Sequence, residues 1–433
     1  MSLALYSHLD QILSTLPKGR TEVAPERNFQ IFGQLMSILS NPQKSLRNVI
    51  HVAGTNGKGS TVASLKAFLE SQGYTVNAYT SPHLVYVTER ILLQNHQIDP
   101  LYLLELLNAL MRLHHQCPFN YFHALTACAF LAFKEYPADY TILEVGMGGR
   151  FDATNVFKAP LATVFTPLSL DHQPFLGASL KQIAAEKLGI VKTGIPMLSA
   201  AQPQEVEPLF ETYAQELRCE LQRERESWQY HSVEDGFIFQ YKKNAPLRLP
   251  IPNLAGAHQL QNVSLSLATL SALNLINNHE TLSKSLNRIS LQGRLMETAY
   301  KGSPLWIDGA HNVSAAQILA YHSRTSWKGE KLQLVFSMTK KEDVYAFLKF
   351  LKPYIHVVYC PFMNQPFVDR SLIERSCWTL KIPYRSCDTL ETALTLSLKE
   401  RSMKTLVTGS LYLVGEVLKL IQYAEHNDKL LDS

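Results

Sequence analysis

One glycine-rich segment constrains this chain more than any other feature. Residues 52–61 read VAGTNGKGST, directly after an apolar, strand-like run and before a helix-like run. The three glycines let backbone amides converge on phosphate oxygens, and Lys58 and the helix N-terminus add positive potential. The segment departs from the common G-x-x-x-x-G-K-[ST] loop, because Val52 replaces the first glycine and Gly59 separates Lys58 from Ser60. We predict a nucleotide phosphate site here; a turn with a solvated lysine is the alternative.

Short β-rich runs alternate with amphipathic runs along most of the chain, which predicts a parallel sheet covered by helices on both faces. The rhythm restarts after residue 294. We therefore predict an α/β fold with two doubly wound domains, residues 1–295 and a smaller Rossmann-like domain of residues 296–433. Residues 202–252 are predicted to form a helix followed by a small antiparallel addition. The expected strands are residues 48–53, 140–145, 162–166, 305–308, 332–337, 356–359 and 405–408.

Composition narrows the class of protein. The 433 residues are 46% hydrophobic and 18% charged, which is typical of a soluble globular protein large enough for two cores. The net charge of +4 gives no reason to expect nucleic acid or membrane binding. Residues 1–18 resemble an amphipathic helix and not an export signal, so a cytoplasmic location is expected. The six cysteines show no metal or disulfide spacing, and we expect reduced, mostly buried thiols.

Two strand ends carry groups suited to a metal ion. Glu144 closes one apolar strand, and Asp171-His172 follow the strand at 162–166. The carboxyl ends of parallel strands face the crevice where α/β proteins bind ligands, so these groups are predicted to flank one site. On local evidence alone His172 also fits a structural histidine, Ser81 fits a Ser-Pro turn, and Lys187 fits a surface lysine of a helix.

Nine motifs then appear in order between residues 54 and 417, and together they resemble the bacterial folylpolyglutamate synthase/dihydrofolate synthase family of the Mur ligase superfamily. The resemblance covers nearly the whole chain and implies an N-terminal P-loop ATPase-like Mur ligase domain. The motifs are GTNGKGST at 54–61, TSPHL at 80–84, LEVGMGGRFDATN at 143–155, DHQPFLG at 171–177, IAAEKLGIVK at 183–192, GAHQLQN at 256–262, QGRLM at 292–296, DGAHN at 308–312 and TGSLYLVGEV at 408–417.

The resemblance also implies roles for single residues. Magnesium would be bound by Ser81, Glu144, His172 and Lys187, the last as a carbamate. Lys58, Glu144, His172 and Lys187 would form the catalytic set. The residues implied to bind ATP are Thr55, Asn56, Gly57, Lys58, Gly59, Ser60, Asn262, Arg294 and Asp308, with His311 on the same loop.

A pterin site is the part of the resemblance where this chain departs most. Residues 23–27 read VAPER where LGLER-like residues are usual, and His123 replaces a more usual acidic residue. The residues implied to contact the pterin are Glu22, Val23, Ala24, Asn120, Tyr121, Phe122, His123, Phe151, Asp152 and Ala153.

The implied activity is ATP-dependent amide formation. Transfer of the γ-phosphoryl group would turn a pteroate or folate carboxylate into an acyl phosphate, which L-glutamate then attacks. The expected partners are small molecules, and a monomer is expected. Three alternatives stay open: a monofunctional folylpolyglutamate synthase, a peptidoglycan Mur ligase, and a nucleotide-dependent switch protein without ligase activity.

Overall fold

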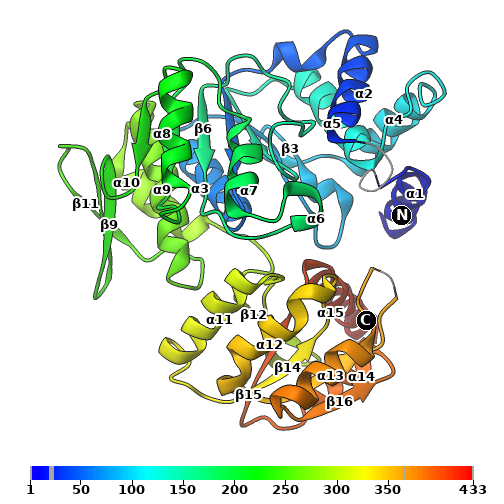
Figure 1. Cartoon of the computed structure of the whole chain (residues 1–433). Helices are drawn as coiled ribbons and strands as arrows, with labels where there is room; N and C mark the ends of the chain where they lie inside the picture. The colour runs from blue at the N-terminus through cyan, green and yellow to red at the C-terminus, as the bar shows by residue number, and fades with distance from the viewer. Residues whose placement is uncertain (1, 19–23, 365, 432–433) are drawn as a thin grey trace. The chain divides into compact units, whose positions relative to one another are not determined.

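The computed structural model describes residues 2–18, 24–364 and 366–431, which form two compact units. Unit 1 comprises residues 1–253 and 259–290, and unit 2 comprises residues 254–258 and 291–433. Figure 1 draws unit 1 mainly in blue to green and unit 2 mainly in yellow to red. Among the helices that are described, none is both long and apolar enough to span a membrane.

An eight-stranded sheet forms the centre of unit 1, in the order β4-β3-β2-β5-β1-β6-β7-β8. Six strands run parallel, namely β2, β5, β1, β6, β7 and β8. At the other edge β3 pairs antiparallel with β2 and with β4. Because β1 lies between β5 and β6, the chain reverses its winding there, and the loops after these three strands meet at one edge. The strands are β1 (Val49–Ala53), β2 (Val76–Tyr79), β3 (Ile91–Leu93), β4 (His96–Gln97), β5 (Tyr140–Glu144), β6 (Ala162–Phe165), β7 (Met197–Ser199) and β8 (Leu221–Arg223).

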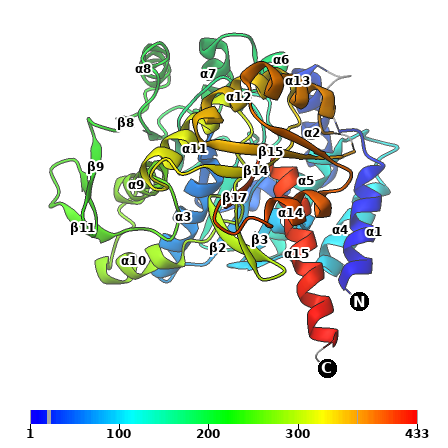
Figure 2. The same ribbon diagram turned by 90° about the horizontal axis from the view of Figure 1, so that it is seen from below.

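Helices cover both faces of this sheet, as Figure 2 shows with α7 and α8 on one side and α3, α9 and α10 on the other. Every residue of β1 and β5 is buried, as expected for strands covered on both faces. The helices are α1 (Ser2–Ser14), α2 (Pro25–Ile38), α3 (Lys58–Ser71), α4 (Pro100–Met111), α5 (Tyr121–Glu135), α6 (Gln173–Leu176), α7 (Leu180–Leu188), α8 (Glu207–Glu216), α9 (His258–Ala272) and α10 (His279–Ser285).

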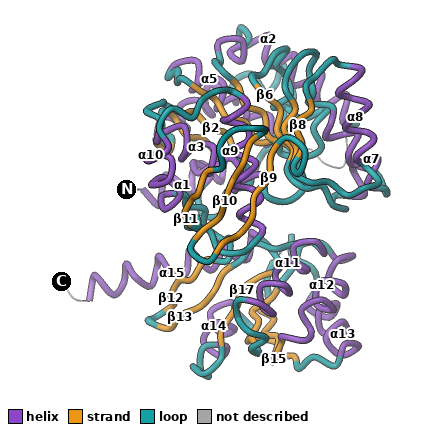
Figure 3. The backbone as a smooth tube through the Cα atoms, turned by 90° about the vertical axis from the view of Figure 1, so that its left-hand side faces the viewer, coloured by secondary structure: helices purple, strands orange, loops and turns teal. Residues whose placement is uncertain are grey.

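A three-stranded antiparallel sheet follows α8 and β8, with the strands side by side in Figure 3. It contains β9 (Trp228–Val233), β10 (Gly236–Tyr241) and β11 (Leu247–Pro250). Phe237 and Phe239 alternate with less buried residues, so one face of this sheet is packed. The predicted helix and antiparallel addition within residues 202–252 are confirmed.

Unit 2 contains a six-stranded sheet in the order β12-β13-β17-β14-β15-β16. Only the pairing of β12 with β13 is antiparallel among these strands. The elements are β12 (Met296–Tyr300), β13 (Ser303–Ile307), β14 (Leu332–Phe336), β15 (Ile355–Pro361), β16 (Tyr384–Cys387), β17 (Lys404–Thr408), α11 (Val313–Thr325), α12 (Val344–Leu351), α13 (Arg370–Leu380), α14 (Leu390–Ser397) and α15 (Leu411–Leu431). The predicted fold class, two doubly wound α/β units, is confirmed.

All six cysteines are free thiols, five of them buried and Cys219 partly exposed. This confirms the expectation drawn from their spacing.

Candidate active site

The glycine-rich segment joins β1 to α3 through two positions that tolerate no side chain. Gly54 has φ +145°, and a Cβ there would lie 1.8 Å from Oγ1 of Thr166. Gly57, the N-cap of α3, has φ +91°, and a Cβ there would lie 2.3 Å from Oδ1 of Asn262. Asn262 is buried, and its Nδ2 donates a hydrogen bond to Gln259 Oε1 at 3.0 Å. The predicted loop therefore lies between a strand and a helix, with Asn262 packed directly on it.

The other residues of the loop differ in their contacts and in how far they are exposed to solvent. Thr55 Oγ1 donates to the carbonyl of Ser169 at 3.1 Å, which fixes the loop to the segment after β6. Ser60 is buried, whereas Asn56 and Gly59 are partly exposed. The helix N-terminus thus presents backbone amides and partly exposed polar groups together, the arrangement that favours an anion.

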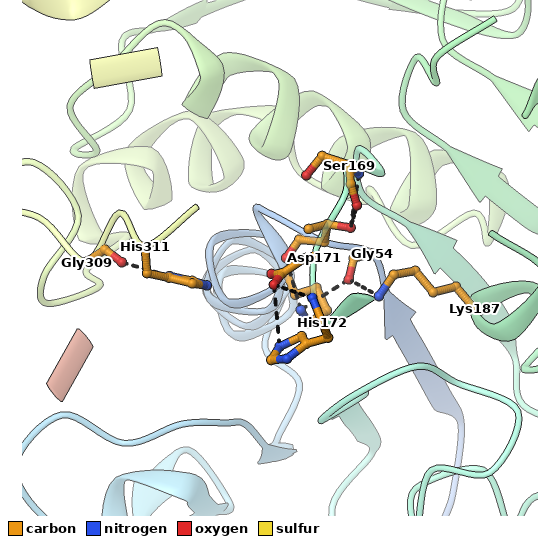
Figure 4. A network of polar contacts seen from close by, with 9 residues as sticks. Gly54, Ser169, Asp171, His172, Lys187, Gly309 and His311 are labelled. Atoms are coloured by element: carbon orange, nitrogen blue, oxygen red, sulfur yellow. Dashed lines mark hydrogen bonds and ion pairs between the residues drawn. The ribbon is translucent and has the colours of Figure 1, made fainter. Parts of the chain in front are cut away.

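Two lysine ammonium groups meet at the carbonyl oxygen of Gly54. Lys58 Nζ donates to it at 3.2 Å. Lys187 Nζ donates to it at 2.8 Å, as Figure 4 shows. Lys187 lies on α7 and is only 5% exposed, so the alternative of a surface lysine is wrong. Burial, and next the charge of Lys58, lower the pKa of Lys187 to about 7. A large fraction of this amine is therefore unprotonated near neutral pH.

Glu144 lies at the end of β5, next to the phosphate loop. It pairs in register with Val52 of β1 and is 4% exposed. Its Oε2 accepts a hydrogen bond from the backbone amide of Ser81 at 3.2 Å. Ser81 follows β2, which pairs with β5 on the other side from β1. Neighbouring strands therefore bring a buried carboxylate and a serine hydroxyl to the edge where the phosphate loop lies.

His172 occupies the segment after β6 in a left-handed conformation, with φ +52°. Its backbone amide donates to Asp171 Oδ1 at 2.7 Å, and its ring Nε2 lies 3.8 Å from the same oxygen (Figure 4). Asp171 therefore lies beside both the backbone amide and the ring of His172. Sequence reasoning had noted Asp171 only as a neighbour, although it begins the DHQPFLG motif.

These residues suit magnesium bound to a nucleotide. No group of three His, Cys, Asp or Glu side chains that could hold a metal ion occurs among the described residues. Magnesium on a nucleotide needs only one or two carboxylates, because phosphate oxygens and water fill the other positions. The oxygen atoms of Ser81 and Glu144 fit that requirement. His172 lies in the segment that follows β6.

The residues predicted for the pterin that the structure describes fall mainly into two groups, one at the start of α5 and one in the loop after β5. Asn120 caps α5 by accepting from the amide of His123, and the ring of Phe122 lies where a Cβ on Gly146 would be, at 2.4 Å. Burial lowers the pKa of His123 to about 4, so this ring is neutral at neutral pH. The guanidinium carbon of Arg90 lies 5.4 Å from the centroid of the Tyr121 ring. The sequence analysis did not single out Arg90.

Asp152 is the most constrained residue of the second group. Its two oxygens accept from the amides of Gly146, Met147 and Thr154 and from the Thr154 hydroxyl. Burial raises the pKa of this carboxyl despite these bonds. Ala153 is buried and Phe151 packs edge-on against Phe29. Ala24 is exposed before α2, while Glu22 and Val23 lie outside the described residues.

In unit 2 the structure brings together three of the residues predicted to bind the nucleotide. Asp308 follows β13, is buried, and accepts from the amides of Leu295 and Ala310, both at 2.8 Å. A Cβ on Gly309 would lie 2.7 Å from Nη1 of Arg294, and Nδ1 of His311 lies 2.9 Å from the Gly309 carbonyl. Burial raises the pKa of Asp308, against the nearby charge of Arg294.

Comparison with known proteins gives three concordant findings. The Mur ligase middle domain matches residues 52–270. A dihydrofolate synthase/folylpolyglutamate synthase of Bacillus subtilis is 32% identical over 427 residues, covering 93% of this chain and 97% of the relative. The structure of Escherichia coli FolC in complex with DHPP and ADP superposes with a TM-score of 0.85 at 27% identity, over 97% of this chain and 98% of that one.

A second solved structure adds the metal and the amino acid. It is a bifunctional folylpolyglutamate synthase/dihydrofolate synthase with Mn, AMPPNP and L-glutamate bound, with a TM-score of 0.82 at 27% identity over 96% of this chain and 98% of that one. Because the domain match and the full-length similarity agree with the loop, strand-end and lysine geometry described above, the chain belongs to the Mur ligase family, among its dihydrofolate synthases and folylpolyglutamate synthases.

Proposed function

We propose that this protein is an ATP-dependent ligase that joins L-glutamate to the carboxylate of dihydropteroate and of reduced folates. The observation that carries the proposal is the convergence of Lys58 and Lys187 on Gly54, at the edge where Glu144 also lies. Relatives with full-length similarity carry both activities in their names, and the solved ones hold ADP, a nucleotide analogue, manganese or glutamate.

The reaction begins with attack of a carboxylate oxygen on the γ-phosphorus of ATP, and ADP leaves with the broken P–O bond. The amino group of glutamate then attacks the acyl carbon, loses a proton and displaces inorganic phosphate. Lys58 and the amides of the phosphate loop would offset the negative charge on the transferring phosphoryl oxygens. Asn262, Arg294, Asp308 and His311 are proposed as further nucleotide-binding residues.

Ser81, Glu144 and His172 are the proposed magnesium ligands, and the ion would supply charge neutralisation on the phosphates. Lys187 is proposed to act as a carbamate. Its nitrogen attacks carbon dioxide and releases one proton, which requires an unprotonated amine. A buried lysine whose pKa is lowered to about 7 meets that requirement, whereas an exposed one near 10.5 does not.

The pterin is proposed to bind near Ala24, Asn120–His123 and Phe151–Ala153, with Glu22 and Val23 as further candidates. The neutral ring of His123 in place of an acid predicts a weaker polar hold on the pterin at this position. We propose a monomer that acts on small molecules.

The test supplies purified protein with ATP, magnesium and glutamate, and either dihydropteroate or tetrahydrofolate. Product masses are then read. Glutamate addition to both acceptors is expected. Addition to tetrahydrofolate alone would identify a monofunctional folylpolyglutamate synthase, and addition to neither would refute the proposal.

A further inference from the structure

The end of α7, which carries Lys187, packs backbone to backbone against the loop of residues 146–155. A Cβ on Gly149 would lie 2.8 Å from the carbonyl oxygens of both Glu186 and Lys187. A Cβ on Gly189 would lie 2.4 Å from Cβ of Arg150. The amide of Arg150 also donates to the Glu186 carbonyl at 2.8 Å. The two segments therefore touch without intervening side chains, and small movements of one displace the other.

Asn155 closes this contact with its side-chain amide. Its Nδ2 donates to the carbonyl of Arg150 at 3.0 Å, in the loop, and to the carbonyl of Gly189 at 3.1 Å, at the end of α7. Asn155 is 7% exposed. One buried amide thus joins the loop to the turn that follows Lys187.

Lys192 fixes the orientation of that amide. Its Nζ donates to Asn155 Oδ1 at 2.8 Å. An ammonium group can only donate hydrogen bonds, so the side-chain oxygen of Asn155 must face Lys192. The NH₂ group of Asn155 then faces the two carbonyls. The Lys192 side chain is partly buried, and this burial lowers its pKa. We call Asn155, Lys192 and the two carbonyl partners the clasp.

We propose that the clasp positions Lys187, with Asn155 and Lys192 as positioning residues for the ligase reaction. The proposal rests on the proposed function of Lys187. The clasp fixes the last turn of α7, and from that turn Lys187 Nζ reaches Gly54 at 2.8 Å. Without the clasp this turn is held only by its remaining contacts with the loop, so the amine shifts away from the phosphate loop, where the proposed magnesium ion would bind.

The test compares Asn155→Ala with Asn77→Ala. Asn77 is also buried, donates to the Tyr136 carbonyl and accepts from the Gln94 amide, both at 2.8 Å, but lies outside the clasp. We expect both variants to lose similar thermal stability. Only Asn155→Ala should lose kcat, by roughly 10- to 100-fold for a misplaced catalytic group, with KM for ATP nearly unchanged.

Two further readouts do not need ligase activity. In ¹³C-bicarbonate, the lysine carbamate NMR signal of the wild type should disappear in Asn155→Ala and persist in Asn77→Ala. Reductive methylation followed by peptide mass spectrometry should modify Lys187 several-fold faster in Asn155→Ala than in the wild type. Lys192→Met should behave like Asn155→Ala, and Lys192→Arg should retain much of the wild-type behaviour.

The outcomes separate the two proposals. A wild type inactive with both acceptors would refute the proposed function, while the methylation rate of Lys187 would still test the clasp. Equal methylation rates in Asn155→Ala, Asn77→Ala and the wild type would refute the clasp, whatever the activity.

Discussion

Replacing Lys187 by methionine should make the protein more stable while abolishing its activity. Burial lowers the pKa of this lysine from 10.5 to about 7. At pH 7 the unfolded chain therefore binds the proton more tightly than the folded protein does, which favours the unfolded state. At about 1.4 kcal/mol per pKa unit this costs about 4 kcal/mol at pH 7. Methionine removes this cost and loses the hydrogen bond to Gly54, worth about 1 kcal/mol. The expected net gain is about 3 kcal/mol.

The gain should depend on pH with a definite sign. Below pH 7 both the folded and the unfolded lysine are protonated, so the full cost is present. Between pH 7 and 10.5 only the unfolded lysine still binds the proton, so wild-type stability rises with pH and the advantage of Lys187→Met shrinks. Between pH 7 and pH 9 it should shrink by roughly 2 kcal/mol.

Hydrogen exchange of peptides covering β1 and β5, read by mass spectrometry in buffer freed of carbon dioxide, measures this stability within unit 1. Lys181→Met is the matched control, because Lys181 lies on the same helix and is exposed. The control should change stability by less than about 0.5 kcal/mol. A Lys187→Met variant less stable than the wild type at pH 7, or a difference that does not change with pH, would refute the reasoning.

Three further predictions concern the nucleotide and the second unit. Gly57→Ala, with its Cβ 2.3 Å from Asn262 Oδ1, should weaken Mg-ADP binding at least about ten-fold by calorimetry, about 1.4 kcal/mol; unchanged affinity would contradict the loop geometry. Glu144→Gln keeps an acceptor for the Ser81 amide, so the fold should persist while magnesium no longer strengthens ADP binding; a retained magnesium effect would exclude Glu144 as a ligand. Asp308→Ala leaves two buried amides without acceptors and should lower the stability of unit 2 by about 2–4 kcal/mol in thermal unfolding, which a loss below about 1 kcal/mol would contradict.

Much of the fold followed from local patterns in the sequence. The runs at 48–53, 140–145 and 162–166 are β1, β5 and β6, because continuous apolar runs flanked by glycine or polar loops are typical of buried parallel strands. The sequence did not predict the strands β2, β3, β4, β7, β8, β12 and β16. Each has at most five residues, and all but β2 lie at or next to a sheet edge, where neighbouring strands and not local sequence fix the structure.

The boundary between the two units shows the limit of reading a chain in order. A break after residue 295 was expected and stays a proposal. In the structure the contacts of unit 2 begin at residue 291 and also include residues 254–258, which end at the first residue of α9. Contacts between segments distant in sequence carry no periodic signal, so such an exchange is not visible in composition or hydrophobic pattern.

The candidate site divides in the same way. Lys58 and Glu144 were predictable from the strands beside them. The loop that carries Lys58 directly follows β1, and Glu144 is the last residue of β5. Lys187 was not, since its helix looks like any surface helix, and only the resemblance singled it out. The clasp residues Asn155 and Lys192 gave no local signal either, because their partners lie on other segments. The cytoplasmic location stays a prediction.

The central claim is that the site activates a carboxylate as an acyl phosphate. Dihydropteroate labelled with ¹⁸O in its carboxylate, incubated with the protein, ATP, magnesium and glutamate, tests it directly by mass spectrometry of the released phosphate. We predict one ¹⁸O atom in each phosphate released with product. Label found in AMP, or phosphate released with product but carrying no ¹⁸O, would contradict the account.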